Sequence, residues 1–231
     1  NYPGSAVTIA NGALLQSNLT TDYGGAIFNG FGSIIAIDAS SLLSNTASQG
    51  GGLHNQDEGS VVTIATASRL QANAGLGADS VGGAISNVLT GTVVITGSTL
   101  LLANQADFGG ALFVTAGGIV AVNASHIQAN TAITSGGGIY NNDTGRVVID
   151  RSLLEGNTAQ QGFGGAVRNF GQVTVSSSRL LSNTAGNGLG GAIATSDGVG
   201  SALAVSHSTL QHNSAGAGGA LYQLGGISTM T

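Results

Sequence analysis

A short glycine motif recurs eight times along the chain, at intervals of 26 to 32 residues. It consists of two glycines, a small residue and an aliphatic residue. Its first glycines are Gly24, Gly50, Gly82, Gly109, Gly136, Gly164, Gly190 and Gly218. An internal period of this length predicts a solenoid, in which each repeat packs mainly against its two neighbours.

A second motif, of the general form S-x-L-x-x-N-x-A, precedes each glycine pair. Its asparagines are Asn18, Asn45, Asn73, Asn104, Asn130, Asn157, Asn183 and Asn213. We interpret them as a structural ladder, because asparagine tolerates the left-handed conformation of a bend and its amide can donate to a carbonyl of the next coil. A second, less complete ladder is expected at Asn29, Asn55, Asn87, Asn141 and Asn169.

A third segment of each repeat alternates aliphatic and other residues, as in Val7–Ile9, Ile35–Ile37 and Val120–Val122. Alternation with period 2 predicts strands, and no stretch has the 3.6-residue period of a helix. Three such segments in about 27 residues predict an all-β fold, a right-handed parallel β-helix of about eight coils with three short strands per coil. Residues 1–231 are expected to form a single β-helix domain.

The repeat also predicts which side chains face the core. The residue after the glycine motif's small residue is aliphatic in every repeat, as at Ile27, so it is expected to point inward. The next position varies freely and is expected to point to solvent. Its aromatic members form a candidate binding or interface stripe, because exposed rings stack on sugars or dock other proteins. This stripe comprises Phe28, Phe113, Tyr140 and Tyr222, with Tyr23, Phe108 and Phe163 near the same edge.

The glycine and asparagine motifs together resemble the repeats of the chlamydial polymorphic outer-membrane proteins and of related bacterial β-helix proteins. The quoted motifs are GGAI at Gly24, Gly82 and Gly190, and the hydrophobic-x-x-N sequence Leu42–Asn45. The resemblance covers nearly the whole chain. It implies an exported, surface-displayed rod that is often adhesive, and it supplies no catalytic residues.

Catalytic and metal-binding chemistry is not expected. Parallel β-helices include polysaccharide lyases and hydrolases, which need carboxylates about 5–10 Å apart. Asp79 and Asp107 precede the glycine pair in adjacent repeats, but no Arg or His recurs beside them. Asp57, Glu58 and Asp143 lie in turns where they could bind Ca²⁺ weakly. A histidine-based metal or catalytic site is not expected either, because the four histidines occupy unrelated positions in the repeat: His54, His126, His207 and His212.

Composition narrows the partners further. The net charge is −5, charged residues make up 6% of the chain and there is no lysine, so a nucleic-acid partner is not expected. The chain has no cysteine, which excludes disulfides and thiolate metal sites and fits a bacterial protein exported to the cell surface or beyond. No apolar run approaches the ~20 residues of a membrane-spanning helix. No cofactor is expected.

Three functions remain as hypotheses. The first is an extracellular structural protein whose β-helical subunits stack end to end into a surface fibre or matrix, since neither end of the chain carries a polar cap. The second is an adhesin-like passenger module that binds a glycan or a host or cell-surface protein through the aromatic stripe. The third is a polysaccharide lyase or hydrolase, which the scarcity of acidic residues disfavours.

Overall fold

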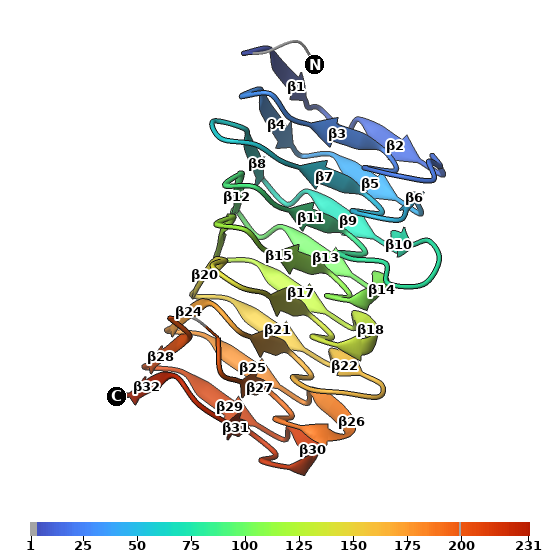
Figure 1. The fold of residues 1–231 in the computed structure, drawn as a ribbon. Coiled ribbons are helices and arrows are strands. Elements are labelled where there is room, and N and C mark those ends of the chain that lie inside the picture. Colours follow the sequence, from blue (N-terminus) through green and yellow to red (C-terminus); the bar gives the residue numbers. More distant parts are fainter. Residues whose placement is uncertain (1–3, 199) are drawn as a thin grey trace.

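A computed structural model describes residues 4–198 and 200–231. Figure 1 shows a stack of similar coils that runs from the N-terminus at the top to the C-terminus at the bottom. In the described residues the regular structure consists of 32 strands arranged in four parallel sheets. No helix long and apolar enough to cross a membrane is found in this part of the chain.

The four sheets run along the stack, and the strands of a coil follow one another in the order A, B, C, D, except that the first coil has no strand in sheet C. Sheet A consists of β1 (Ala6–Ile9), β4 (Ile34–Asp38), β8 (Val61–Ala65), β12 (Thr92–Ile95), β16 (Ile119–Asn123), β20 (Arg146–Asp150), β24 (Gln172–Ser176), β28 (Ala202–Ser206) and β32 (Ile227–Met230). Sheet B consists of β2 (Leu14–Gln16), β5 (Ser41–Leu43), β9 (Arg69–Gln71), β13 (Leu100–Leu102), β17 (His126–Gln128), β21 (Leu153–Glu155), β25 (Arg179–Leu181) and β29 (Thr209–Gln211).

The other two sheets lie on either side of the glycine pairs. Sheet C consists of β6 (Thr46–Ala47), β10 (Ala74–Gly75), β14 (Gln105–Phe108), β18 (Thr131–Ser135), β22 (Thr158–Ala159), β26 (Thr184–Leu189) and β30 (Ser214–Ala217). Sheet D consists of β3 (Ile27–Asn29), β7 (Leu53–Asn55), β11 (Ile85–Asn87), β15 (Leu112–Val114), β19 (Ile139–Asn141), β23 (Val167–Asn169), β27 (Ile193–Thr195) and β31 (Leu221–Gln223).

The predicted parallel solenoid of about eight coils is confirmed, but the prediction of three strands per coil was wrong. The fourth strand belongs to sheet C and begins directly after the ladder asparagine. Strands such as β6 and β22 contain two residues, of which the alanine alone is fully buried. A strand with one small inward residue shows no alternation of aliphatic residues, so the sequence pattern did not reveal it. The right hand of the coil stays a prediction.

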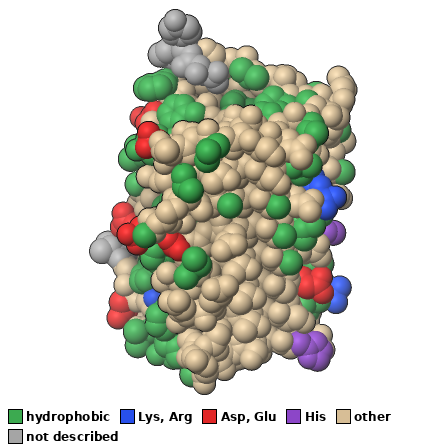
Figure 2. Space-filling model, turned by 90° about the vertical axis from the view of Figure 1, so that its right-hand side faces the viewer, with side chains coloured by type: hydrophobic (Ala, Val, Ile, Leu, Met, Phe, Trp, Pro, Cys, Tyr) green, Lys and Arg blue, Asp and Glu red, His purple; other side chains and the backbone are tan. Residues whose placement is uncertain are grey.

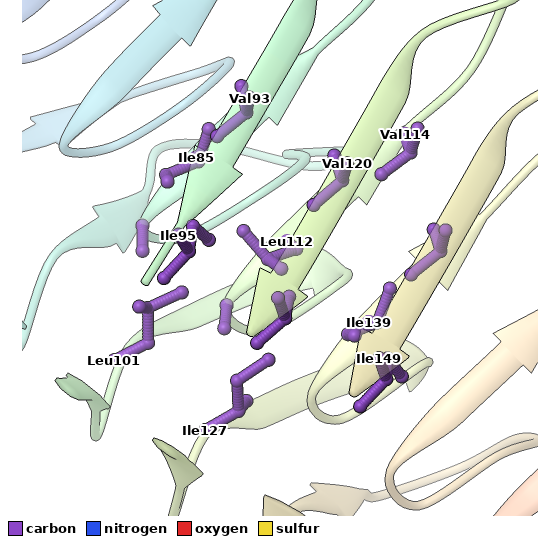
Figure 3. Packing of buried hydrophobic residues seen from close by; sticks show 14 of the residues in the cluster. Ile85, Val93, Ile95, Leu101, Leu112, Val114, Val120, Ile127, Ile139 and Ile149 are labelled. Atoms are coloured by element: carbon purple, nitrogen blue, oxygen red, sulfur yellow. The ribbon is translucent and has the colours of Figure 1, made fainter. Parts of the chain in front are cut away.

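The aliphatic column of sheet D lines up inside the coil as expected. Ile27 pairs with Leu53, and Leu53 pairs with Ile85. Figure 3 shows Ile85, Leu112 and Ile139 in successive coils, facing the sheet A side chains across the interior. The core is therefore one continuous apolar column. Each Leu or Ile removed from water in this column contributes roughly 1.5–3 kcal/mol to the free energy of folding.

The asparagine ladder connects all eight coils. Each Nδ2 donates to Oδ1 of the asparagine in the next coil at 2.9–3.0 Å, as from Asn45 to Asn73. Asn45 Nδ2 also donates to the Leu15 carbonyl of the preceding coil. The ladder is confirmed, but its asparagines do not adopt the left-handed conformation. That conformation falls on the residue before each asparagine, with φ between 51° and 64°, at Ser17, Ser44, Ala72, Ala103, Ala129, Gly156, Ser182 and His212.

The second ladder is interrupted, as predicted. Asn29 donates to Asn55 and Asn55 donates to Asn87, at 2.7 and 2.8 Å. Val114 occupies the position in the next coil, so the ladder resumes only with the 2.9 Å bond from Asn141 to Asn169. Oδ1 of Asn141 has no partner, because the preceding coil offers it no amide. The side-chain hydrogen bonds of the second ladder therefore form two separate series, while the strands of sheet D stay paired throughout.

A third ladder, of hydroxyls, was not anticipated. The serine of the S-x-L motif lies between sheets A and B, and in several coils its Oγ accepts the backbone N–H of the equivalent serine one coil earlier. Thr99 interrupts the series, because its N–H donates to the Thr96 carbonyl. Ser152 Oγ accepts from Ser125 and Ser178 Oγ accepts from Ser152, at 3.2 and 3.0 Å. The motif contained this serine, but a hydroxyl at a turn has many local uses and its period alone did not assign one.

The two glycines of each pair serve different ends. The first has φ between 60° and 70° in every coil, and a Cβ at Gly24 would overlap the backbone oxygen of Ile27. The second approaches the next coil, and a Cβ at Gly25 would overlap the carbonyl oxygen of Gly51. Only glycine fits both positions, which explains why this part of the repeat does not vary.

Candidate binding surface on sheet D

The outward column of sheet D is formed by the middle residue of each strand. In register along the sheet these residues are Phe28, His54, Ser86, Phe113, Tyr140, Arg168, Ala194 and Tyr222. The column points away from the core, but the prediction that it faces solvent throughout was wrong. The four aromatic members are half-buried, and the four others are buried.

Burial of the column has a local cause. Rings from the turn before the glycine pair and from the turn after the sheet D strand approach it from both sides. Tyr23 lies 4.9 Å and 46° from the His54 ring, measured between ring centroids and planes. Phe163 and Phe170 lie on Arg168 in the same way, one from each turn. The turns therefore cover the strands wherever they carry an aromatic residue.

The predicted aromatic stripe divides into two clusters and one separate residue. Near the N-terminus, Phe28 stacks on His54 with 5.7 Å between ring centroids and 13° between planes. Tyr23 and Phe31 flank this pair and are themselves exposed. We call these four residues the N-terminal cluster. Tyr222 lies two coils beyond Arg168, with Ala194 between them.

The central cluster lies in the middle coils. Phe113 and Tyr140 stack in parallel, with 5.6 Å between centroids and 13° between planes. Phe108 meets the Tyr140 ring edge-on at 5.3 Å, and Phe170 lies 5.9 Å away on another side. The cluster is thus a contiguous half-buried patch, which comprises Phe108, Phe113, Tyr140, Phe163, Arg168 and Phe170.

A guanidinium group is enclosed in the central cluster. Cζ of Arg168 lies 4.7 Å from the ring centroid of Phe163 and 4.1 Å from that of Phe170. Arg168 is 6% exposed, and its Nη1 is buried without a hydrogen-bond partner. Burial lowers the pKa of Arg168, and the nearby Tyr140 and Tyr222 side chains act in the opposite direction. Arginine stays protonated in proteins, so a positive charge persists here.

Burial also acts on the tyrosine of this cluster. Removal from water raises the pKa of the Tyr140 phenol, and the Arg168 charge opposes that rise. The Tyr140 phenol therefore stays neutral at physiological pH and is available as a hydrogen-bond donor.

The N-terminal cluster contains a different ionisable group. His54 is 1% exposed, and its Nε2 lies 3.1 Å from Oε1 of Gln56. Burial lowers the pKa of His54, against the opposing influence of the Gln56 hydrogen bond and the Asp57 charge. Its Nδ1 is buried without a partner. This histidine is therefore held neutral among the rings.

Two of the acidic residues considered above accept backbone hydrogen bonds from a neighbouring coil. Asp107 Oδ2 accepts the backbone N–H of Ser80 at 3.1 Å, and Asp57 Oδ2 accepts that of Phe31 at 3.1 Å. Asp143 lies in a turn with φ of 50°. Within residues 4–198 and 200–231, no three His, Cys, Asp or Glu side chains are grouped so as to hold a metal ion.

Three residues of the clusters were not singled out from the sequence. Phe31 and Phe170 lie in the turn after the sheet D strand, one or two residues beyond the second-ladder asparagines Asn29 and Asn169. Their place directly after these asparagines was a usable signal. Arg168 lies in the outward column, but its sequence position did not show that two turns would enclose it.

Elsewhere the surface carries little charge. Figure 2 shows a side of the rod on which uncharged side chains and backbone predominate, with charged side chains mainly near its two edges. Arg151 and Asp150 form an ion pair at 3.1 Å, the one salt bridge within the described part of the chain. The buried guanidinium of Arg168 is therefore not neutralised by a carboxylate of the described residues.

Comparisons with known proteins show no family. No protein-family model matches the chain, and no curated protein matches it in sequence. The expected membership in the bacterial β-helix repeat group thus stays a prediction. One solved structure, a hyper-glycosylated fragment of TibA (55–350) whose glycosylation is catalysed by TibC, is similar at 16% identity over 99% of both chains, with a TM-score of 0.24. The fold described above rests on strand pairing and not on this likeness.

Proposed function

We propose that this protein is a bacterial, exported β-solenoid of the adhesin type that binds carbohydrate through its central cluster. One observation carries the proposal, namely that Phe113 and Tyr140 stack in parallel on the outward side of sheet D while both stay half-exposed. Paired rings offer a flat apolar platform to the C–H face of a sugar, and the phenol supplies a polar tip.

The frame around the platform supports this role. The central cluster stands on β15, β19 and β23, which are held in register by strand pairing, and the ladder bond from Asn141 to Asn169 adds to it between β19 and β23. Rings on short, paired strands lose little freedom when a ligand binds, so less of the binding free energy is spent on ordering them.

Binding without catalysis is part of the same proposal. Glycoside hydrolysis needs two carboxylates that act on one bond. The carboxylate of Asp107 is occupied by a backbone N–H on the neighbouring coil, and the central cluster contains no acidic residue. A surface-displayed rod with a ring platform fits recognition of a cell-surface or host glycan.

A glycan array read with purified protein tests the proposal. We expect binding to one group of related glycans, and a loss of at least about tenfold in affinity for Tyr140→Ala, since removal of one stacked ring costs roughly 1–3 kcal/mol. Tyr23→Ala is the matched control, because it removes an exposed tyrosine of the N-terminal cluster. An array without signal for the wild-type protein, or equal losses for both variants, would overturn the assignment.

End-to-end stacking into a fibre stays a prediction with its own test. The first and last described coils expose apolar side chains at core positions, among them Val7 in β1, in register with Ile35, and Met230 in β32, in register with Val205. Such side chains are the surfaces on which successive coils pack, within one chain or between copies. Light scattering and electron microscopy distinguish filaments from monodisperse short rods, and rods at high concentration would end this hypothesis.

A further inference from the structure

We infer that Arg168 is an anion-binding residue and that the sugar bound by the central cluster carries a carboxylate. This inference rests on the proposed carbohydrate binding and adds the chemical class of the ligand. The guanidinium of Arg168 lies against Phe163 and Phe170 on sheet D. Its Nη1 is buried and has no hydrogen-bond acceptor among the described residues.

A buried charge is normally paired, because its transfer out of water is costly. Arg168 has no carboxylate partner among the described residues, and two cation–π contacts at 4.7 and 4.1 Å offset only part of the cost. Unlike histidine or lysine, arginine does not relieve the cost by losing its proton. The free protein therefore holds a cation whose neutralising group is missing.

Cζ of Arg168 lies over the Phe163 and Phe170 rings, 4.7 and 4.1 Å from their centroids. The N–H groups of a guanidinium lie in its plane, so its hydrogen bonds form at its edge. That edge presents parallel N–H groups, which match the two oxygens of a carboxylate. The two rings come from turns on either side of β23 and are half-buried, so a ligand displaces a ring edge and no strand. The tyrosine hydroxyls of Tyr140 and Tyr222 lie near the same charge and can donate to the anion.

The fold does not need an arginine at position 168. Ala194 occupies the equivalent position in the next strand, paired with Arg168, and Ser86 occupies it three coils earlier. Both are fully buried in regular sheet D strands. A short side chain therefore satisfies the fold at this position, and the long charged one calls for another reason. Ala194 also places no long side chain between Arg168 and Tyr222.

Calorimetric titration with three matched probes tests the inference: trigalacturonate, its fully methyl-esterified form and a sulfated neutral trisaccharide. The wild-type protein is expected to bind trigalacturonate at least about tenfold more tightly than the ester, a gain that corresponds to one charge-assisted bidentate contact. Arg168→Met keeps side-chain length and removes charge, so it is expected to bind acid and ester equally. Arg179→Met, which removes an exposed arginine on sheet B, is the control and keeps the preference.

The outcomes separate the two proposals. Equal binding of acid and ester by the wild-type protein overturns the inference and leaves carbohydrate binding standing. No binding of any saccharide, on the array or here, overturns both. Preference for the sulfated probe overturns the carboxylate assignment. Should Arg168→Met fail to fold, the salt dependence of wild-type binding decides, since only the acid's affinity is expected to fall when salt is raised.

Discussion

The two ring clusters on sheet D enclose basic groups of different kinds. In the N-terminal cluster, His54 stacks on Phe28 and contacts Gln56, with the Asp57 carboxylate close by. In the central cluster, Arg168 lies between two rings with no carboxylate and no hydrogen bond to Nη1. The group that can lose its charge thus has an acidic neighbour, and the group that cannot has none.

That difference separates a structural cluster from a candidate site. A histidine meets burial by becoming neutral, and its aromatic ring then packs like its neighbours. An arginine under the same burial keeps its charge and keeps the cost of an unpaired cation. Natural proteins retain such costs mainly where function uses them.

The largest effect is expected from reversing the charge of the central cluster. Arg168→Glu places a carboxylate against the negative ring faces of Phe163 and Phe170, and the free energy of unfolding should fall by about 3–5 kcal/mol at neutral pH. Urea unfolding followed by circular dichroism measures it. A loss below about 1 kcal/mol would show that the side chain at 168 swings into solvent and that the cluster does not enclose it.

Removing the charge should have a smaller effect of the opposite sign. Arg168→Met keeps an unbranched apolar chain between the rings and removes the unpaired cation, so we expect a gain of about 1 kcal/mol in the free energy of unfolding. The same urea titration measures it. A loss of more than about 2 kcal/mol would mean that the guanidinium holds the two turns together, which would end the comparison in its present form.

The smallest effect concerns pH and the N-terminal cluster. Because burial lowers the pKa of His54, the unfolded chain binds more protons than the folded protein just below the ordinary value of 6.5. Stability contributed by neutral His54 is therefore full above pH 6.5 and is lost as pH falls toward the lowered pKa. The melting temperature should decline from pH 7.5 to 5.5, and less so in His54→Phe.

The control for this pH experiment is His126→Gln, at an exposed position of β17. It should decline as steeply as the wild-type protein, because the groups shared by all three proteins contribute alike. If the melting temperature of His54→Phe declines just as steeply, burial does not keep His54 neutral. The contrast between His54 and Arg168 would then not hold.

Much of the fold could be predicted from the sequence, because every coil of a solenoid shows the same residue pattern at equivalent positions. One aliphatic residue at Ile27 says little, but the same residue type in eight equivalent positions identifies an inward column. The fourth strand escaped because its inward residue is alanine, as at Ala47, and alanine has no preference for strands. The left-handed bend was assigned one residue too late, because asparagine is the residue that usually adopts it.

The site was less predictable, since it depends on what differs between coils. The aromatic column was found from periodicity, but its division into two clusters depends on the turns that carry Phe31 and Phe170. Turns are the part of a repeat that varies, so no neighbouring coil predicts their placement. Arg168 is buried because two such turns cover one strand, and the sequence does not show where these turns lie.

The ladders have a consequence for where such a rod can work. The longest one consists of amides, as at Asn104 and Asn130, and another consists of hydroxyls, as at Ser152 and Ser178. Neither group gains or loses a proton in the range that living surroundings span. The ladders therefore keep the same hydrogen bonds from acidic to alkaline pH. Any dependence of stability on pH comes from titratable side chains on the outward side of the sheets, such as His54.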